Sequence, residues 1–388
     1  MNKLVLLSAV ALAFAGAAAA QTPVKIGMIT TLTTPGGYLG EDVRDGFLLA
    51  MAEEGGKRLG GVPVELVVED DNLKPANGKQ IADKMLQQDK IKLLTGIIFS
   101  NVAGAAFPTI LESGAFYVSP NAGPSNYAGK DCHKNYFVAS WQNDTLHESA
   151  GQAATNHGYK RMVILAPNYQ AGKDALTGFK RYYKGEVQEE IYTKLDQTDF
   201  APELARIRAL KPDAVYQFHP GGTGINFVKQ YAQSGLIATT PMVVSEVSME
   251  PRILAAVGDA AVGMDVTGHW NVDFPNPASQ KFVKDFTARY NRVPTPYAQQ
   301  GYDTARLIAS GLKAVNGDLG KEDAFRAALR KADFVSTRGA FRFGANQHPI
   351  QDWYAFKVEK GADGKPVIVT KGKVLTNQGD AYAKDCRM

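Results

Sequence analysis

Cysteine is nearly absent from this sequence of 388 residues, which has only Cys132 and Cys386. Cys132 stands next to His133, but no further Cys or His lies at metal-ligand spacing, so the sequence gives no support for a metal site. Charge of one sign is also scarce, because 43 Lys and Arg against 39 Asp and Glu leave a net charge of +4. The basic residues are scattered rather than clustered, and we therefore expect no nucleic-acid partner.

The motifs of the common enzyme classes are missing too. The sequence contains no G-x-S-x-G elbow, no H-E-x-x-H zinc motif and no G-x-x-x-x-G-K-S/T phosphate loop. The nearest approach to a dinucleotide fingerprint is Gly222-Thr223-Gly224, but its third glycine position holds Phe227. A glycine-rich turn before a helix explains this stretch better. We therefore expect neither catalysis nor a cofactor.

Long apolar runs are confined to the N-terminus. Lys3 precedes the apolar stretch 4–14, and the small residues 16–20 fit an A-x-A cleavage site before Gln21. This pattern predicts a cleaved secretion signal over residues 1–20 and a soluble, exported mature chain. An uncleaved membrane anchor is the alternative, but the apolar run is short for a membrane span.

The predicted export bears on the oxidation state of the two cysteines. An even count in an oxidising compartment predicts one disulfide, between Cys132 and Cys386, which would tie the C-terminal tail to the middle of the chain. Two free thiols are the alternative.

What the sequence does have is a regular alternation of strands and amphipathic helices. Val24–Thr30 is almost continuously apolar, as in a buried parallel strand, and from Leu39 apolar residues recur at helical spacing. Further strands are expected at 62–69, 92–98, 115–118 and 136–140, and after a restart at 161–166, 187–192, 213–218 and 241–245. This pattern predicts an α/β fold with two doubly wound parallel sheets, in two lobes of about 150–200 residues.

The restart of the alternation is marked by a helix. Thr145 and Glu148 have capping-box spacing, so we expect a helix to start at Thr145, with His147 as a packed or solvent-facing residue. Towards the C-terminus, two long helices flank Pro294–Pro296, and strands are expected at 340–343, 352–358 and 367–370.

The opening K-I-G-M-I-T-T-L-T-T-P-G-G, followed by R-x-G-x-x-L-A-x-x-E-x-G-G, resembles the extracytoplasmic solute-binding proteins of ABC importers. The similarity is to the type I periplasmic group that includes the leucine/isoleucine/valine-binding proteins, and it covers nearly the whole mature chain. It implies an N-terminal lobe of residues 22–140 and 273–338 and a C-terminal lobe of residues 141–272 and 339–388, joined by a hinge of three crossings. The alternation alone would have given two sequential domains.

The same resemblance implies a location and partners. It places the chain in the periplasm, where it would bind a small carboxylate and deliver it to an ABC permease in the inner membrane. We expect a monomer. Proteins of other classes stay open as alternatives: a ligand-sensing subunit of a receptor, or an exported enzyme on the same fold.

Loops after the strands supply the candidate binding groups. Where two such sheets face each other, their carboxyl-terminal loops line a cleft, and helix N-termini there can hold a carboxylate without a buried cation. The candidates are Tyr38, Phe99, Ser100, Asn101, Asn121, Ala122 and Gly123 in the first lobe and Tyr169, His219 and Glu246 in the second.

The resemblance also implies roles for some of these residues. The loops at Ser100 and at Asn121–Gly123 would contact the ligand carboxylate, Tyr169 would pack over the ligand, and Glu246 would pair with an amino group. Other interpretations stay open: Tyr38 and Tyr169 as surface aromatics, and the remaining groups as local caps and turn residues.

The ligand class stays open between two sets. Asn121-Ala122-Gly123 stands where branched-chain amino-acid binders usually show small residues followed by Thr, and His219 stands where Gly or Tyr is more usual. The run C-H-K-N-Y-F-V-A-S-W-Q-N-D at 132–144 is similar to a subgroup associated with aromatic carboxylates. A flat aromatic acid would stack on tyrosine faces and would not need Glu246.

Overall fold

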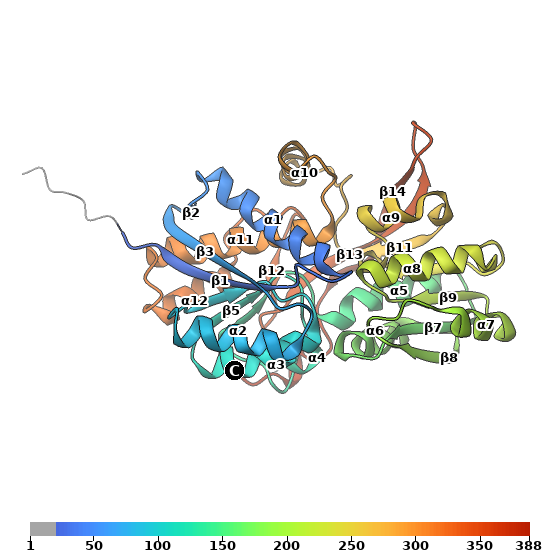
Figure 1. Cartoon of the computed structure of the whole chain (residues 1–388), viewed down its shortest axis with the longest axis horizontal. Helices are drawn as coiled ribbons and strands as arrows, with labels where there is room; N and C mark the ends of the chain where they lie inside the picture. Colours follow the sequence, from blue (N-terminus) through green and yellow to red (C-terminus); the bar gives the residue numbers. More distant parts are fainter. Residues whose placement is uncertain (1–20) are drawn as a thin grey trace, which may run out of the picture.

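The computed structural model describes residues 21–388, so the secretion signal predicted at 1–20 lies outside the described residues. Two α/β lobes lie side by side, each built on one sheet (Figure 1). The first sheet forms lobe one with helices α1–α4 and α10–α12, and the second forms lobe two with helices α5–α9. The lobe boundaries expected at 140/141, 272/273 and 338/339 stay a prediction.

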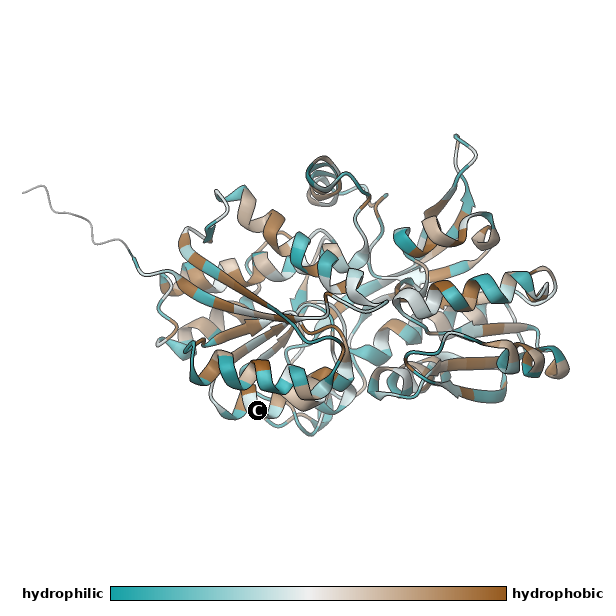
Figure 2. Cartoon of the chain, viewed as in Figure 1, coloured by the Kyte–Doolittle hydropathy of each residue, from teal (hydrophilic) through white to brown (hydrophobic). Residues whose placement is uncertain are grey.

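The first sheet has the strand order β2-β3-β1-β4-β5-β6. Strands β3, β1, β4, β5 and β6 run parallel, and β2 pairs antiparallel with β3 at one edge. The strands are β1 (Val24–Thr30), β2 (Arg58–Leu59), β3 (Val62–Asp70), β4 (Leu93–Thr95), β5 (Phe116–Ser119) and β6 (Tyr136–Val138). In β1, the last five residues are all buried, as the apolar run predicted. Figure 2 shows the central strands mostly brown, and outer helices such as α2 with teal residues.

Helix α11 brings a late part of the chain into lobe one. A Cβ atom on Gly46 of α1 would lie 1.9 Å from the carbonyl oxygen of Ala298, and one on Gly301 of α11 would lie 2.0 Å from that of Val43. Glycine on both helices therefore permits their close approach. The helices of this lobe are α1 (Gly37–Glu53), α2 (Pro75–Gln87), α3 (Ser100–Glu112), α4 (Ser125–Ala128), α10 (Pro277–Tyr290), α11 (Pro296–Val315) and α12 (Glu322–Lys331).

The second sheet has the strand order β12-β13-β11-β10-β9-β7-β8, and β14 pairs with β13. Strands β7 to β11 are parallel, whereas β12, β13 and β14 pair antiparallel with their neighbours. The strands are β7 (Arg161–Pro167), β8 (Glu186–Thr193), β9 (Ala214–Gln217), β10 (Met242–Ser245), β11 (Asp265–Gly268), β12 (Arg342–Phe343), β13 (Pro349–Lys360) and β14 (Pro366–Gln378). The helices are α5 (Asn143–Asn156), α6 (Gln170–Tyr182), α7 (Ala201–Leu210), α8 (Gly221–Gln233) and α9 (Pro251–Val257).

The predicted α/β class is confirmed, with antiparallel strands added at sheet edges. The parallel strands of both sheets follow the same order. Counted along the chain, the first parallel strand of each sheet lies between the second and the third. The strand order reverses between β1 and β4 in lobe one and between β7 and β9 in lobe two. The loops that leave these two neighbouring strands therefore diverge. Such switch points leave a crevice at the carboxyl ends of the strands, where ligands bind.

Some elements differ from the sequence-based expectation. Helix α5 begins at Asn143, two residues before Thr145, and the Thr145 hydroxyl donates to the Gln142 carbonyl at 2.7 Å instead of capping the helix. Strand β11 and helix α12 were not expected from the sequence. The strand is short and contains Asp, Thr and Gly, so it lacks the apolar pattern that identifies a strand.

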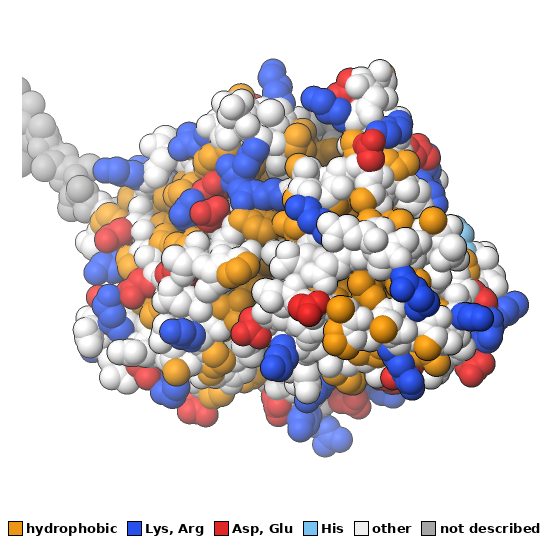
Figure 3. Space-filling view, turned by 45° about the vertical axis from the view of Figure 1, so that its right-hand side comes forward, with side chains coloured by type: hydrophobic (Ala, Val, Ile, Leu, Met, Phe, Trp, Pro, Cys, Tyr) orange, Lys and Arg blue, Asp and Glu red, His pale blue; other side chains and the backbone are white. Residues whose placement is uncertain are grey.

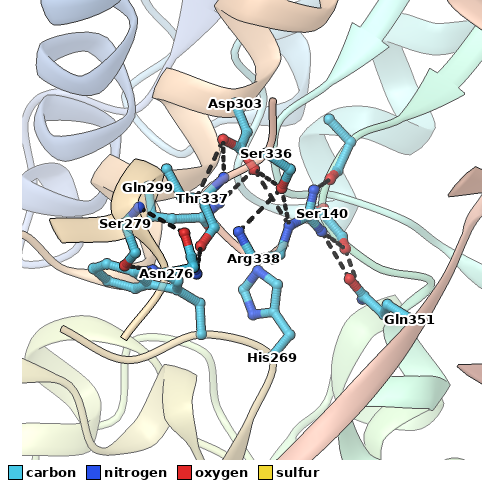
Figure 4. Close-up of polar contacts among 12 residues, drawn as sticks. Ser140, His269, Asn276, Ser279, Gln299, Asp303, Ser336, Thr337, Arg338 and Gln351 are labelled. Carbon is cyan, nitrogen blue, oxygen red and sulfur yellow. Dashed lines mark hydrogen bonds and ion pairs between the residues drawn. The ribbon is translucent and has the colours of Figure 1, made fainter. Parts of the chain in front are cut away.

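A buried arginine holds the connections between the lobes together (Figure 4). Arg338 donates to the backbone oxygens of Ala139 at 2.6 Å and Ser140 at 3.1 Å, both at the end of lobe one's sheet. It also donates to Gln351 of β13 at 2.7 Å and to Asp303 of α11 at 3.4 Å. One side chain thus ties the first connection between the lobes, residues 139–142, to both lobes.

The predicted disulfide between Cys132 and Cys386 is present, with Cα atoms 5.5 Å apart. It fastens the tail that follows β14 to the loop before β6, which places the C-terminus beneath lobe one in Figure 1. Within residues 21–388, no helix combines the length and apolarity that a bilayer span requires. The same part of the chain holds no cluster of three or more His, Cys, Asp or Glu side chains arranged to bind a metal ion.

Candidate functional site

A small cavity lies between the lobes at the two switch points. Its atom-free space is about 380 Å³, which includes some space open to solvent, so the cavity suits only a small ligand. Both lobes and the first connection contribute walls. The side chains used below are Phe99, Ser100, Asn121 and Tyr297 from lobe one, Trp141 from the connection, and Asn143, His147, Tyr169, Phe218 and Val247 from lobe two.

Aromatic rings form much of the lining. Tyr169 of lobe two lies between Phe99 of lobe one, at a ring-centroid distance of 6.5 Å, and Phe218, at 6.3 Å and nearly parallel. Burial raises the pKa of the Tyr169 and Tyr297 phenols, so both hydroxyls are neutral at ordinary pH. A flat ring would find stacking and edge-on partners here.

The first turn of α3 provides polar groups at the cavity. Ser100 is the first residue of this helix, and no side chain caps the helix. The Ser100 oxygen accepts a hydrogen bond from the Asn143 amide at 3.1 Å, so its own hydrogen can be donated to a ligand. Unpaired backbone N–H groups and the helix dipole favour a negative charge at such a place.

Neighbouring polar groups are held by other protein atoms. The Asn143 amide also donates to Asp174 at 2.9 Å, and its oxygen accepts from the Gly123 amide at 3.1 Å. Burial, with the nearby Asp144, raises the pKa of Asp174 to about 6. Asn121 donates to Gln300 at 2.8 Å, which fixes the orientation of its amide.

His147 is a packed residue, which is one of its two sequence-based interpretations, and it also lines the cavity. Its Nδ1 atom shares a hydrogen bond with the Tyr216 hydroxyl, and its ring lies 4.8 Å from that of Phe218. Burial lowers its pKa to about 3, so the imidazole is neutral. The second ring nitrogen is therefore a neutral polar group that a ligand could use.

The predicted site residues divide into two groups. Phe99, Ser100, Asn121 and Tyr169 line the cavity together. The other six are not part of its lining, and their ligand roles stay predictions. Tyr38 donates to Glu250 of lobe two, Asn101 follows Ser100 in α3, the Ala122 carbonyl accepts from Ser119 and Tyr136, and Gly123 contacts Asn143.

His219 is enclosed by lobe two. Its ring nitrogens bond to Thr193 at 3.0 Å and Gln217 at 2.8 Å, and its ring stacks on Phe227 with centroids 5.0 Å apart. Burial lowers its pKa to about 3. This environment is that of a neutral core histidine.

Glu246 is held by His269. The Glu246 carboxylate bonds to the imidazole of His269 and accepts from the His269 backbone N–H at 3.2 Å. The ring of His269 lies 5.0 Å from that of Trp141, which lines the cavity, and the neighbour Val247 lines it too. The carboxylate thus lies behind the cavity wall.

The lobes are closed over the cavity. The Gly222 amide donates across the gap to the Pro35 carbonyl at 3.2 Å. On another side, the Ser125 hydroxyl donates to Asp174 at 2.7 Å. Opening the cleft would separate both pairs, so a bound ligand could leave only after they part.

Comparisons with known proteins agree with this architecture. A family model described as "Periplasmic binding protein" matches residues 23–365. The Leu/Ile/Val-binding protein homolog 6 of Brucella melitensis is 29% identical over 377 residues, which cover 94% of this chain and 95% of the relative. These matches confirm the resemblance found in the sequence.

Solved structures show the same similarity. A solute-binding protein of an ABC transporter from R. palustris, in complex with benzoate, is 32% identical, with a TM-score of 0.89 and coverage of 95% of this chain and 100% of that one. One from Rhodopseudomonas palustris BisB5, in complex with 3,4-dihydroxybenzoic acid, is 27% identical with a TM-score of 0.84, over 92% and 99%. A branched-chain amino-acid transporter binding protein from Streptococcus pneumoniae, in complex with isoleucine, is 19% identical with a TM-score of 0.78, over 90% and 100%, and shares the fold.

Proposed function

Because this chain belongs to the periplasmic binding protein family, we propose that it binds a small aromatic carboxylate in the cavity between its lobes and delivers it to an ABC permease. The family is one of binding proteins rather than enzymes, so no catalytic residue is assigned. One observation carries the choice of ligand. Within the described chain, the cavity is lined by aromatic, aliphatic and neutral polar residues, with no Asp, Glu, Lys or Arg among them.

This lining disfavours an α-amino acid. A buried ammonium group needs a charged partner, since its desolvation is otherwise very costly. The acids near the cavity have protein partners: Glu246 bonds to His269, and Asp174 accepts hydrogen bonds from Ser125 and Asn143. An aromatic acid brings no ammonium group and avoids this cost.

The carboxylate of such a ligand has a suitable place at the start of α3. The Ser100 hydroxyl and the free N–H groups of the first turn can donate to it. The ring would then lie among Phe99, Tyr169 and Phe218. Both parts of the ligand are matched without any charged side chain.

A branched-chain amino acid is the second candidate. One oxygen of Glu246, Oε2, is buried without a hydrogen-bond partner among residues 21–388, so it could accept from an ammonium group if Trp141 moved aside. The benzoate and isoleucine complexes of similar proteins fit the first and second candidates respectively.

Export through a cleaved signal, a periplasmic location and a monomeric state belong to the same proposal. The similarity to solute-binding proteins of ABC transporters supports the permease as partner. Figure 3 shows basic and acidic side chains interspersed over the visible face, and the proposal includes no nucleic-acid partner.

A thermal-shift panel on refolded, ligand-free mature protein tests the choice between the candidates. Benzoate, hydroxybenzoates and cinnamate are compared with leucine, isoleucine and valine. A ligand at about 100 times its dissociation constant stabilises the native state by roughly 2.7 kcal/mol. We expect the aromatic acids alone to raise the melting temperature. A response to the amino acids alone would replace the first candidate with the second, and silence in both sets would overturn the proposal.

A further inference from the structure

Two polar contacts join the lobes through residues that lie outside the cavity lining. The Tyr38 hydroxyl in α1 of lobe one donates to Glu250 Oε1 in lobe two at 2.9 Å. Arg252, at the start of α9 in lobe two, pairs with Asp42 of α1 at 2.9 Å. None of these four residues, which we call the interlobe cluster, belongs to the cavity lining.

Glu250 is fixed by its own lobe. It is the N-cap of α9, and its carboxylate accepts from the backbone N–H of Arg252 at 2.8 Å and of Ile253 at 3.0 Å. The acceptor for Tyr38 is therefore already in position before the lobes meet.

Asp42 is likewise held in position by its own lobe, which is lobe one. Its carboxylate is buried and accepts from Arg292 and from the Thr295 hydroxyl, both at 2.7 Å and both in lobe one. Within residues 21–388, Asp42 forms ion pairs with Arg292 of lobe one and Arg252 of lobe two. Arg252 is therefore its only ion-pair partner from lobe two in this part of the chain.

The two contacts between the lobes form one unit. The Arg252 guanidinium lies over the Tyr38 ring, 4.9 Å from its centroid, which is a cation–π distance. Because their partners lie in different lobes, the hydrogen bond, the ion pair and the cation–π contact exist only while the lobes are closed. Their free energy stabilises the closed state and not the open one.

We propose that the interlobe cluster sets the affinity and residence time of the ligand from outside the cavity lining. The proposal rests on the proposed function, in that a bound ligand requires the closed lobes. A ligand that binds the closed state has an apparent affinity proportional to the fraction of closed protein. The members of the cluster are positioning residues, since they act through lobe closure and do not touch the cavity.

Stopped-flow kinetics with benzoate test this role. Tyr38→Phe keeps the ring and removes the hydroxyl, so it deletes the hydrogen bond to Glu250. We expect the dissociation rate to rise roughly fivefold to tenfold, from the usual net strength of one intramolecular hydrogen bond, with the association rate unchanged. Arg252→Gln should act in the same direction. A residue that only stabilised the fold would change neither rate constant.

Tyr302→Phe is the matched control. The Tyr302 hydroxyl also donates to a glutamate, Glu53, at 3.0 Å, but both residues lie in lobe one. This variant should leave both rate constants at their wild-type values. An equal change in the control and in Tyr38→Phe would overturn the proposal.

A distance measurement tests the role of the cluster independently of which ligand the protein binds. Spin labels at the exposed residues Gln80 in lobe one and Ala205 in lobe two report the separation of the lobes without any ligand. We expect Tyr38→Phe and Arg252→Gln to shift the population towards the longer distance. If benzoate binds no form of the protein, the proposed ligand fails while this shift still supports the cluster. Distance distributions identical to wild type in both variants would overturn the cluster's role.

Discussion

The indole of Trp141 meets the imidazole of His269 edge to face, with ring centroids 5.0 Å apart. Trp141 lines the cavity, whereas His269 holds the carboxylate of Glu246. The acid that would pair with a ligand ammonium group therefore already has a partner on one of its two oxygens, and it lies behind the indole. This relationship is the main reason to prefer an aromatic acid over an amino acid.

Ser100 should determine how the carboxylate is held. Ser100→Ala removes the hydroxyl at the start of α3, and we expect benzoate affinity to fall about tenfold, the usual effect of losing one hydrogen bond to a charged group. Isothermal titration measures this change. Ser113→Ala, just after the other end of the same helix, is the control and should leave the affinity unchanged. Equal benzoate affinities of Ser100→Ala and wild type would show that the ligand carboxylate does not bind at the start of α3.

Phe218 should provide preference for a flat ring. Phe218→Leu keeps an apolar side chain but removes the stacking contact with Tyr169. We expect the preference for benzoate over cyclohexanecarboxylate to shrink roughly threefold to tenfold, the range for an aromatic pair. Competition binding measures the ratio. Phe200→Leu, in the interior of lobe two, should lower stability without changing the ratio, and a ratio unchanged in Phe218→Leu would contradict the stacking.

Glu250 should make stability depend on pH. Burial, together with the nearby charge of Asp42, raises the pKa of this carboxyl from the usual 4.5 to about 7, although the hydrogen bonds that it accepts from Tyr38 and from the backbone of Arg252 and Ile253 oppose this shift. The folded chain therefore holds the proton more strongly than the unfolded chain. This contribution to stability is complete below pH 4.5 and is lost as the pH rises through 7, by about 3 kcal/mol in total.

Urea denaturation of wild type and Glu250→Gln, at pH 5 and at pH 8, isolates this contribution. We expect the wild type to lose stability relative to the variant between the two pH values, since glutamine does not titrate. A difference between the two proteins that is the same at both pH values would show that Glu250 is ionised normally.

The disulfide should stabilise the folded chain. Cys132→Ser with Cys386→Ser frees the tail after β14 from lobe one, and we expect a loss of about 2–4 kcal/mol in the free energy of unfolding. Denaturant titration of this variant against the oxidised wild type measures it. Addition of a reductant to wild type should reproduce the loss, and unchanged stability after complete reduction would contradict this assignment.

Much of the fold could be predicted because it depends on local patterns. The predicted strand at Val24–Thr30 has the observed bounds, and the helix predicted from Leu39 begins two residues earlier, at Gly37. Apolar runs and helical periodicity mark such elements whatever surrounds them. The disulfide followed from the cysteine count and the predicted export.

The site could be predicted only in part, because its walls come from distant segments. Phe99, Ser100, Asn121 and Tyr169 follow strands, where a binding residue is expected. Tyr297 lies at the start of a helix whose close packing on α1 depends on glycines of both helices, and Trp141 lies in a connection. Their approach to the cavity depends on tertiary packing, which no local pattern encodes. The only available signal was the position of Trp141 at an expected crossing.

A pair of ligands that differ only in the ammonium group tests the central claim most directly. Isothermal titration of the ligand-free protein compares leucine with 4-methylpentanoate, which has the same carbon skeleton and carboxylate, and uses benzoate as reference. If the cavity offers no charged partner, 4-methylpentanoate should bind more tightly than leucine, and benzoate more tightly than both. Tighter binding of leucine, abolished by Glu246→Gln, would contradict the account and identify Glu246 as the ammonium partner.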